Sequence, residues 1–126
     1  FVAKGHYERH VRYATRQYQR QRDIMISWIQ RYFPKGAGIS YPQGSFLLWV
    51  ELPAAVDCVK LNQRLAQHAI HVAPGSLFSA SGKFRQCLRL NYAFTLTPSI
   101  ENAVRTVGEL ATEMVEEAQT HATSVI

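Results

Sequence analysis

The chain has 126 residues, of which 47% are hydrophobic and 18% charged, and its formal net charge is +5. This length and composition predict a single domain with a real hydrophobic core and exclude an intrinsically disordered chain. No apolar run approaches the roughly 18–20 residues needed to cross a bilayer, which excludes a membrane-spanning helix.

A long basic helix is predicted first, over residues 5–33, and Pro34 ends it. Residues 1–35 contain eight of the 14 basic residues and only two of the nine acidic ones, Glu8 and Asp23. Such a charge suggests nucleic-acid binding. However, apolar residues recur at helical spacing, which predicts a packed helix with its arginines on the solvated face. This stripe consists of Tyr7, Val11, Ala14, Tyr18, Met25, Trp28 or Ile29, and Tyr32, with Gln21 in one slot. We therefore interpret residues 1–35 as an amphipathic linker helix.

Two strands are predicted next, over residues 39–41 and 45–52, with a turn between them and Pro53 after the second. Residues 46–50 are continuously apolar, which is typical of a strand that is covered on both faces. A helix follows over residues 57–70. Asp57 is its expected N-cap, and Leu61, Leu65 and Ala69 form its apolar stripe at a spacing of four.

Two further strands are predicted over residues 70–73 and 85–94, followed by a helix that starts at Thr97 as N-cap and Pro98 at the first helical position. Its stripe consists of Ile100, Val104, Val107, Leu110 or Ala111, Met114 and Ala118. The order α-β-β-α-β-β-α predicts an α+β domain with a small, mostly antiparallel sheet, over residues 36–119. Residues 120–126 are expected to be a frayed tail.

Arg89 lies in the middle of an apolar strand, where it is unusual. Because side chains alternate along a strand, one face is expected to carry Leu88, Leu90, Tyr92 and Phe94 and the other Cys87, Arg89, Asn91 and Ala93. A half-buried guanidinium needs a planar anionic partner. No acidic residue lies within ten positions of Arg89, so the partner comes from elsewhere in the fold, from solvent or from a ligand. Taken alone, the strand favours the simpler alternative, an arginine facing water on an open sheet.

No complete catalytic or metal-binding set can be found from spacing. His6 and His10 lie one helical turn apart without a third ligand, so we interpret them as surface residues. The five histidines show no zinc-type pattern, and no nucleophile–histidine pair can be argued. Cys58 and Cys87 each fall inside a predicted element, which favours buried thiols in a reducing compartment over a disulfide.

Four stretches, in this order, resemble the C-terminal small domain of fold-type-I, pyridoxal-phosphate-dependent aminotransferases. They are the run YPQGSFLLWVELP at residues 41–53, the helix at 57–70, HVAPGSLF at 71–78 and LRLNYA at 88–93. The first helix, from His6 to Arg12 and on to Asp23, is similar to the opening of this domain in MocR-type regulators of the GntR family. Those proteins join a winged helix-turn-helix DNA-binding domain to an aminotransferase-like body. Enzymes that act on aminoadipate or aromatic amino acids share much of the pattern.

The resemblance implies roles for a few residues. Arg89 matches the arginine that binds the α-carboxylate of the amino-acid substrate or ligand, and Asn91 on the same face would orient it. Tyr41 and Gly44 belong to a turn that lies near the substrate side chain in this family. The usual proline followed by two glycines is replaced here, because Gln43 precedes Gly44 and Ser45 follows it. Close approach of the backbone to a ligand is therefore left open at this turn.

The resemblance also implies that the catalytic groups lie outside this chain. The lysine and the phosphate-binding groups that hold pyridoxal phosphate belong to the larger domain, so the parent protein is expected to bind the cofactor and this chain is not. We expect a ligand-sensing part of a cytoplasmic, homodimeric MocR-type regulator that contacts DNA only through a separate N-terminal domain. The alternatives are the small domain of a working class I/II aminotransferase and a free-standing interaction domain that uses its basic helix.

Overall fold

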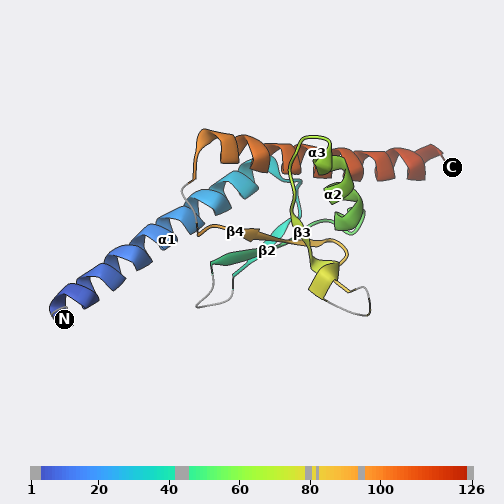
Figure 1. The fold of residues 1–126 in the computed structure, drawn as a ribbon. Helices are drawn as coiled ribbons and strands as arrows, with labels where there is room; N and C mark the ends of the chain where they lie inside the picture. Colours follow the sequence, from blue (N-terminus) through green and yellow to red (C-terminus); the bar gives the residue numbers. More distant parts are fainter. Residues whose placement is uncertain (1–3, 42–45, 79–80, 82, 94–95, 125–126) are drawn as a thin grey trace.

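The computed structural model describes residues 4–41, 46–78, 81, 83–93 and 96–124. Its helices are α1 (Lys4–Tyr32), α2 (Cys58–Ala66) and α3 (Pro98–Ser124), and a short 3-10 helix, η1, spans Gly75–Phe78. Its strands are β1 (Gly38–Ser40), β2 (Leu47–Glu51), β3 (Ala73–Pro74) and β4 (Cys87–Asn91). This order confirms the predicted α+β class, and Figure 1 shows α3 along the top of the molecule with the strands beneath it.

The four strands form one sheet in the order β1-β2-β4-β3, and every pairing within it is antiparallel. The central pair places Leu48 opposite Leu90 and Val50 opposite Leu88. Directly paired side chains point to the same face, so these residues form one apolar face. The alternation predicted for β4 is therefore correct.

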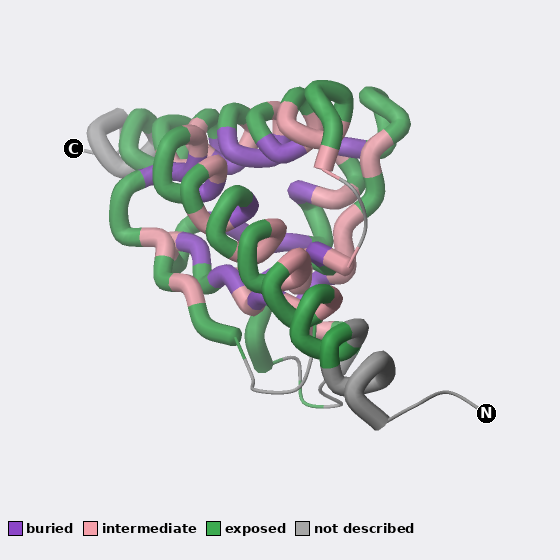
Figure 2. The backbone as a smooth tube through the Cα atoms, turned by 90° about the vertical axis from the view of Figure 1, so that its left-hand side faces the viewer, coloured by how far each residue is buried: buried purple, intermediate pink, exposed green. Residues whose placement is uncertain are grey.

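All three α-helices cover that apolar face of the sheet. Leu48, Val50 and Leu88 are completely buried and belong to one core cluster with side chains from every α-helix. The helical members of the cluster include Met25, Ile29, Leu61, Leu65, Val104, Val107, Ala111 and Met114. Figure 2 shows the buried residues concentrated on the strands and on the inner sides of the helices. The opposite face of the sheet is left without an α-helix among the described residues.

The helices are also joined to one another by polar contacts. The Tyr32 hydroxyl of α1 donates a 2.7 Å hydrogen bond to the Glu101 carboxylate of α3. The Arg64 guanidinium of α2 binds both carboxylate oxygens of Glu117 of α3, at 2.8 and 3.0 Å. Gly108 lies where α1 and α3 approach most closely, because a Cβ there would come within 2.7 Å of the Tyr32 carbonyl carbon.

The two halves of α1 differ in burial. Met25 and Ile29 in the second half are buried, whereas Val11 in the first half is 43% exposed although it belongs to the predicted apolar stripe. Figures 1 and 2 both show the first half extending away from the sheet. The second half of α1 is thus part of the domain, although the sequence assigned all of residues 1–35 to a linker helix.

Both predicted N-caps are confirmed. The Asp57 carboxylate accepts a 2.9 Å hydrogen bond from the Val59 N–H, and the Thr97 hydroxyl accepts one from the Ile100 N–H at 3.3 Å. These short polar side chains satisfy backbone donors that have no partner inside a helix.

Several predicted boundaries were wrong. The second helix ends at Ala66, and Ala69 adopts a left-handed φ of 58° because the Ile70 N–H reaches back to the Leu65 carbonyl and closes the helix end. Strand β4 ends at Asn91, since the Asn91 side chain takes up the Ala93 N–H and turns the chain. The tail predicted from residue 120 is helical as far as Ser124, the end of α3.

Two more predictions need correction. Strand β2 has the predicted apolar run, but Leu47 and Trp49 are only half-buried because no α-helix covers their face. Both cysteines are free thiols, but only Cys58 is buried, whereas Cys87 is half-buried on the open face.

Candidate functional site

The open face of the sheet carries a continuous row of side chains that contains Arg89. Strand pairing places Arg89 opposite Trp49 on β2 and opposite Ala73 on β3, and Trp49 in turn opposite Ser40 on β1. These four residues therefore point to the same face. Arg89 lies near the middle of this row, on a strand that has neighbours on both sides.

Arg89 is half-buried, and its position is fixed by the most rigid part of the fold. Its neighbours in the chain, Leu88 and Leu90, point to the helix-covered face, and Leu88 is completely buried. A strand anchored in this way holds the Cα of the arginine in place, and only the side chain remains to be oriented. This geometry suits a group that must bind a small anion at one defined point.

Asn91 shares the open face with Arg89 and lies at the end of the same strand. Its side-chain oxygen accepts a 2.7 Å hydrogen bond from the Ala93 N–H. This contact closes a turn of the type that Asn favours. In this geometry Asn91 shapes the strand end next to Arg89.

Tyr41 does not join this group. Its ring lies under the Arg22 guanidinium of α1, whose carbon is 4.8 Å from the ring centroid. Because α1 covers the opposite face of the sheet, Tyr41 is separated from the row that contains Arg89. Gly44, the other predicted ligand-proximal residue, lies outside the described residues.

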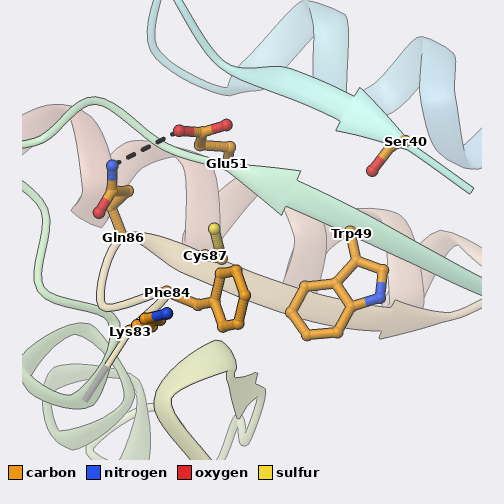
Figure 3. A pocket seen from close by; sticks show the side chains of 7 residues that line it. All are labelled: Ser40, Trp49, Glu51, Lys83, Phe84, Gln86 and Cys87. Carbon is orange, nitrogen blue, oxygen red and sulfur yellow. Dashed lines mark hydrogen bonds between the residues drawn. The ribbon is translucent and has the colours of Figure 1, made fainter. Parts of the chain in front are cut away.

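A pocket of about 450 Å³ lies on the open face next to Arg89 (Figure 3). Its apolar walls are the rings of Trp49 and Phe84, whose centroids are 6.0 Å apart with their planes inclined by 54°. Glu51 and Gln86 lie on its rim, and the Gln86 amide donates a 3.5 Å hydrogen bond to the Glu51 carboxylate. Lys83 also lines the pocket.

Sequence reasoning did not find this pocket. Trp49 could have been assigned to the open face from the alternation of β2, but its pairing with Arg89 is a long-range contact that local spacing does not contain. Phe84 lies in a polar loop and gave no signal. A second cavity of about 380 Å³, at the other end of β4, is lined mainly by apolar core side chains such as Met25, Phe33 and Ile100.

Phe84 has an unusual backbone. Its φ is 65°, a left-handed conformation that bulky side chains rarely adopt. The residue is nevertheless half-exposed, so burial of its ring within this chain does not explain the conformation. Gly75 makes room for it, because a Cβ at Gly75 would lie 2.8 Å from the Phe84 carbonyl oxygen.

The thiol groups near the pocket are protonated at neutral pH. Burial, followed by the proximity of Cys87 and Asp57, raises the pKa of Cys58 to about 12. Burial and the Glu51 carboxylate also raise the pKa of Cys87. Within the described part of the chain, no cluster of three histidine, cysteine or carboxylate side chains could hold a metal ion. No described helix is long and apolar enough to cross a membrane.

Solved structures of aminotransferases have the same fold. LysN, an α-aminoadipate aminotransferase from Thermus thermophilus, matches 90% of this chain with 29% of its own, at a TM-score of 0.74 and 28% sequence identity. A kynurenine aminotransferase from Pyrococcus horikoshii matches 86% of this chain with 27% of its own, at a TM-score of 0.75 and 26% identity. The chain is related to the small domain of fold-type-I aminotransferases.

Curated proteins with similar sequences include regulators as well as enzymes. The HTH-type transcriptional regulator YjiR of Escherichia coli is 45% identical over 92% of this chain, which corresponds to 25% of the regulator. A 2-aminoadipate transaminase of Thermus thermophilus is 30% identical over 74% of this chain and 23% of the enzyme. No family model matches the chain. These homologues confirm the resemblance to aminotransferases and to regulators of the MocR type, and this aminotransferase-type small domain spans about a quarter of their length.

Proposed function

We propose that the chain is the C-terminal part of the aminotransferase-like effector domain of a MocR-type transcription regulator, in which Arg89 binds the carboxylate of an amino-acid ligand. The main support is the position of Arg89 in the middle of a buried central strand, pointing to the uncovered face of the sheet. The high identity to the regulator YjiR favours the regulator over the enzyme.

The open face has the character of a surface that another part of the protein covers. Leu47 and Trp49 on β2 are apolar and half-buried, and they point away from the core. Apolar side chains in contiguous positions on an exposed face are typical of an interface. We propose that the larger lobe of the parent protein docks over this face, so that the ligand binds between the lobe and Arg89.

Arg89 would supply charge and orientation to the bound ligand. A guanidinium binds a carboxylate through two parallel N–H···O hydrogen bonds, and this geometry fixes both the position and the rotation of the acid. Asn91 would act indirectly, because its contact with the Ala93 N–H shapes the end of the strand.

Pyridoxal phosphate is proposed for the parent protein and not for this chain. The described lysines, Lys35, Lys60 and Lys83, are all exposed, and this donor set does not fit a lysine-linked cofactor in a closed site. We expect the chain on its own to retain no cofactor after incubation and dialysis, as measured by absorbance. Persistent absorbance from bound cofactor would contradict this.

The carboxylate role can be tested in the full-length protein by calorimetric titration with amino acids. Arg89→Ala should weaken binding by about 1.5–3 kcal/mol, on the scale of hydrogen bonds to a charged group. Arg89→Lys should recover only part of the affinity, because an ammonium lacks the paired donors. Arg105→Ala is the matched control, since Arg105 is exposed on α3 and pairs with Glu109 at 3.6 Å. Equal affinities in the Arg89 and Arg105 variants would disprove the role of Arg89.

A catalytically active aminotransferase is the second candidate, since solved structures with this fold include aminotransferases. In the enzyme, the same contact of Arg89 would position a substrate for amino transfer, with chemistry supplied by the cofactor. The sequence adjoining the aminotransferase-like body separates the two candidates. A winged-helix domain would support the regulator, which we propose to be dimeric and to bind DNA through that domain. Rapid amino transfer by a full-length protein without such a domain would support the enzyme.

A further inference from the structure

The pocket beside Arg89 has the size and the walls to receive part of the ligand. Pockets that bind small molecules typically have volumes of about 300–1,000 Å³ and are lined by aromatic and apolar side chains with a few polar groups. The pocket on the open face, with about 450 Å³, has two aromatic walls and a polar rim. Figure 3 shows the rings of Trp49 and Phe84 next to each other along one side of it.

The register of the sheet places the pocket one side chain away from Arg89. Along β4, Arg89 and Cys87 point to the same face, and Cys87 lines the pocket. Successive side chains on one face of a strand are about 6.8 Å apart. Trp49 is opposite Arg89 and also lines the pocket, so it belongs to both places. A single amino acid could therefore contact Arg89 with its carboxylate and the pocket with its side chain.

Phe84 provides a second, independent observation. A half-exposed aromatic residue with a φ of 65° costs conformational free energy that burial within this chain does not recover. Gly75 allows the conformation, since any Cβ at that position would overlap the Phe84 backbone. Backbone strain of this kind occurs at ligand-binding positions, where the contact with the ligand makes it useful. The strained residue here is the one whose ring forms a wall of the pocket next to Trp49.

We propose that this pocket receives the side chain of the ligand and that the ligand is an α-amino acid with an aromatic side chain. The inference rests on the proposed role of Arg89 in binding the α-carboxylate. A planar ring fits between the inclined faces of Trp49 and Phe84, where it can make tilted or offset contacts with both. A short aliphatic or acidic side chain leaves these contacts unmade.

The test compares two probes that differ only in the ring, L-phenylalanine and L-alanine, by calorimetric titration of the full-length protein. The wild-type protein should bind L-phenylalanine at least about tenfold more tightly, since each aromatic contact contributes on that scale. Phe84→Gly should remove most of this preference while leaving the affinity for L-alanine unchanged. Glycine accepts a φ of 65°, so the variant should fold at least as stably, as thermal unfolding will show.

Leu77→Ala is the matched control. Leu77 is an apolar residue on η1 that is 71% exposed and does not line the pocket. This variant should bind both probes as the wild type does. If Phe84→Gly keeps the preference for L-phenylalanine, or weakens both probes equally, the inference is wrong.

Arg89→Ala separates this inference from the proposed function. It should weaken both probes by a similar factor, because both carry the same α-carboxylate. No loss in Arg89→Ala, or no binding of either probe to the wild type, would overturn the carboxylate role and the pocket assignment with it. A normal loss in Arg89→Ala together with equal wild-type affinities for the two probes would overturn the pocket assignment alone.

Discussion

The two faces of the sheet are built from similar residues but serve different ends. On β2, Leu48 and Val50 point to the helices and are completely buried, whereas Leu47 and Trp49 point the other way and are half-buried. Hydrophobicity alone does not separate these neighbours. The covered face contributes the stability of the domain, and the open face presents Arg89 beside an aromatic pocket. Adjacent residues on one strand therefore answer to different selective demands.

The largest expected effect comes from opening a cavity on the covered face. Leu48→Ala should lower the free energy of unfolding by about 2–5 kcal/mol, because it removes a completely buried side chain from a packed core. Leu47→Ala, one residue away, should cost less than about 1 kcal/mol, since its side chain is half-exposed in this chain. Urea unfolding followed by circular dichroism measures both. Similar losses would mean that the two faces do not differ in their contribution to stability.

The second prediction concerns the helix layer that covers the sheet. A Cβ at Gly108 would lie 2.7 Å from the Tyr32 carbonyl carbon and 2.9 Å from the Phe33 ring, so Gly108→Ala should push α1 and α3 apart. Overpacking of this kind costs about 1–3 kcal/mol, although alanine is the better helix former. Gly38→Ala is the matched control, because no described heavy atom lies within 4 Å of its Cβ position. Greater stability of Gly108→Ala in thermal unfolding would show that the helices are not in close contact there.

Local chemistry made much of the covered face predictable from sequence. The caps at Asp57 and Thr97 and the alternation of β4 depend on residues close in the chain, and the structure confirms all three. The end of α2 was missed because Ala69 occupies a left-handed position that normally indicates glycine.

The candidate site was only partly predictable. Arg89 could be assigned a face because alternation is local, and the resemblance to aminotransferases suggested its role. Its partner in the row, Trp49, depends on strand register, which joins residues 40 positions apart. Phe84 could not be found, because a positive φ at a bulky residue depends on the space left by Gly75 in another element. Long-range contacts therefore decided the part of the site that sequence reasoning missed.

The third prediction concerns Asp57, which caps α2 beneath the sheet. Burial alone would raise the pKa of this carboxyl, but the N–H groups of Val59 and Lys60 and the guanidinium of Arg85 together lower it. A lowered pKa in the folded state stabilises the protein above the unfolded-state pKa, and this contribution is lost as the pH falls through the folded-state pKa. Asp57→Ala should therefore cost about 1 kcal/mol at neutral pH and less in acid.

Asp57→Asn distinguishes the cap from the charge. Asparagine caps a helix about as well as aspartate, so this variant should keep most of the stability at neutral pH but lose the dependence on acid pH at this position. Unfolding free energies measured between roughly pH 3 and pH 7 provide the comparison. If both variants show the same pH dependence as the wild type, the ionisation of Asp57 does not contribute to stability.

The smallest effect, one on reactivity without a change in stability, compares a thiol beneath the sheet with one on its open face. Cys58 is completely buried with a pKa of about 12, so at pH 8 only about one molecule in ten thousand carries the reactive thiolate. Cys87 also has a raised pKa, but it is half-buried and lines the open pocket. A chromogenic disulfide reagent should modify one thiol per folded chain and two after denaturation, and Cys87→Ser should abolish the native reaction. Rapid modification of Cys58 in folded Cys87→Ser would show that the covered side of the sheet opens readily, and the contrast between the two faces would then be one of degree.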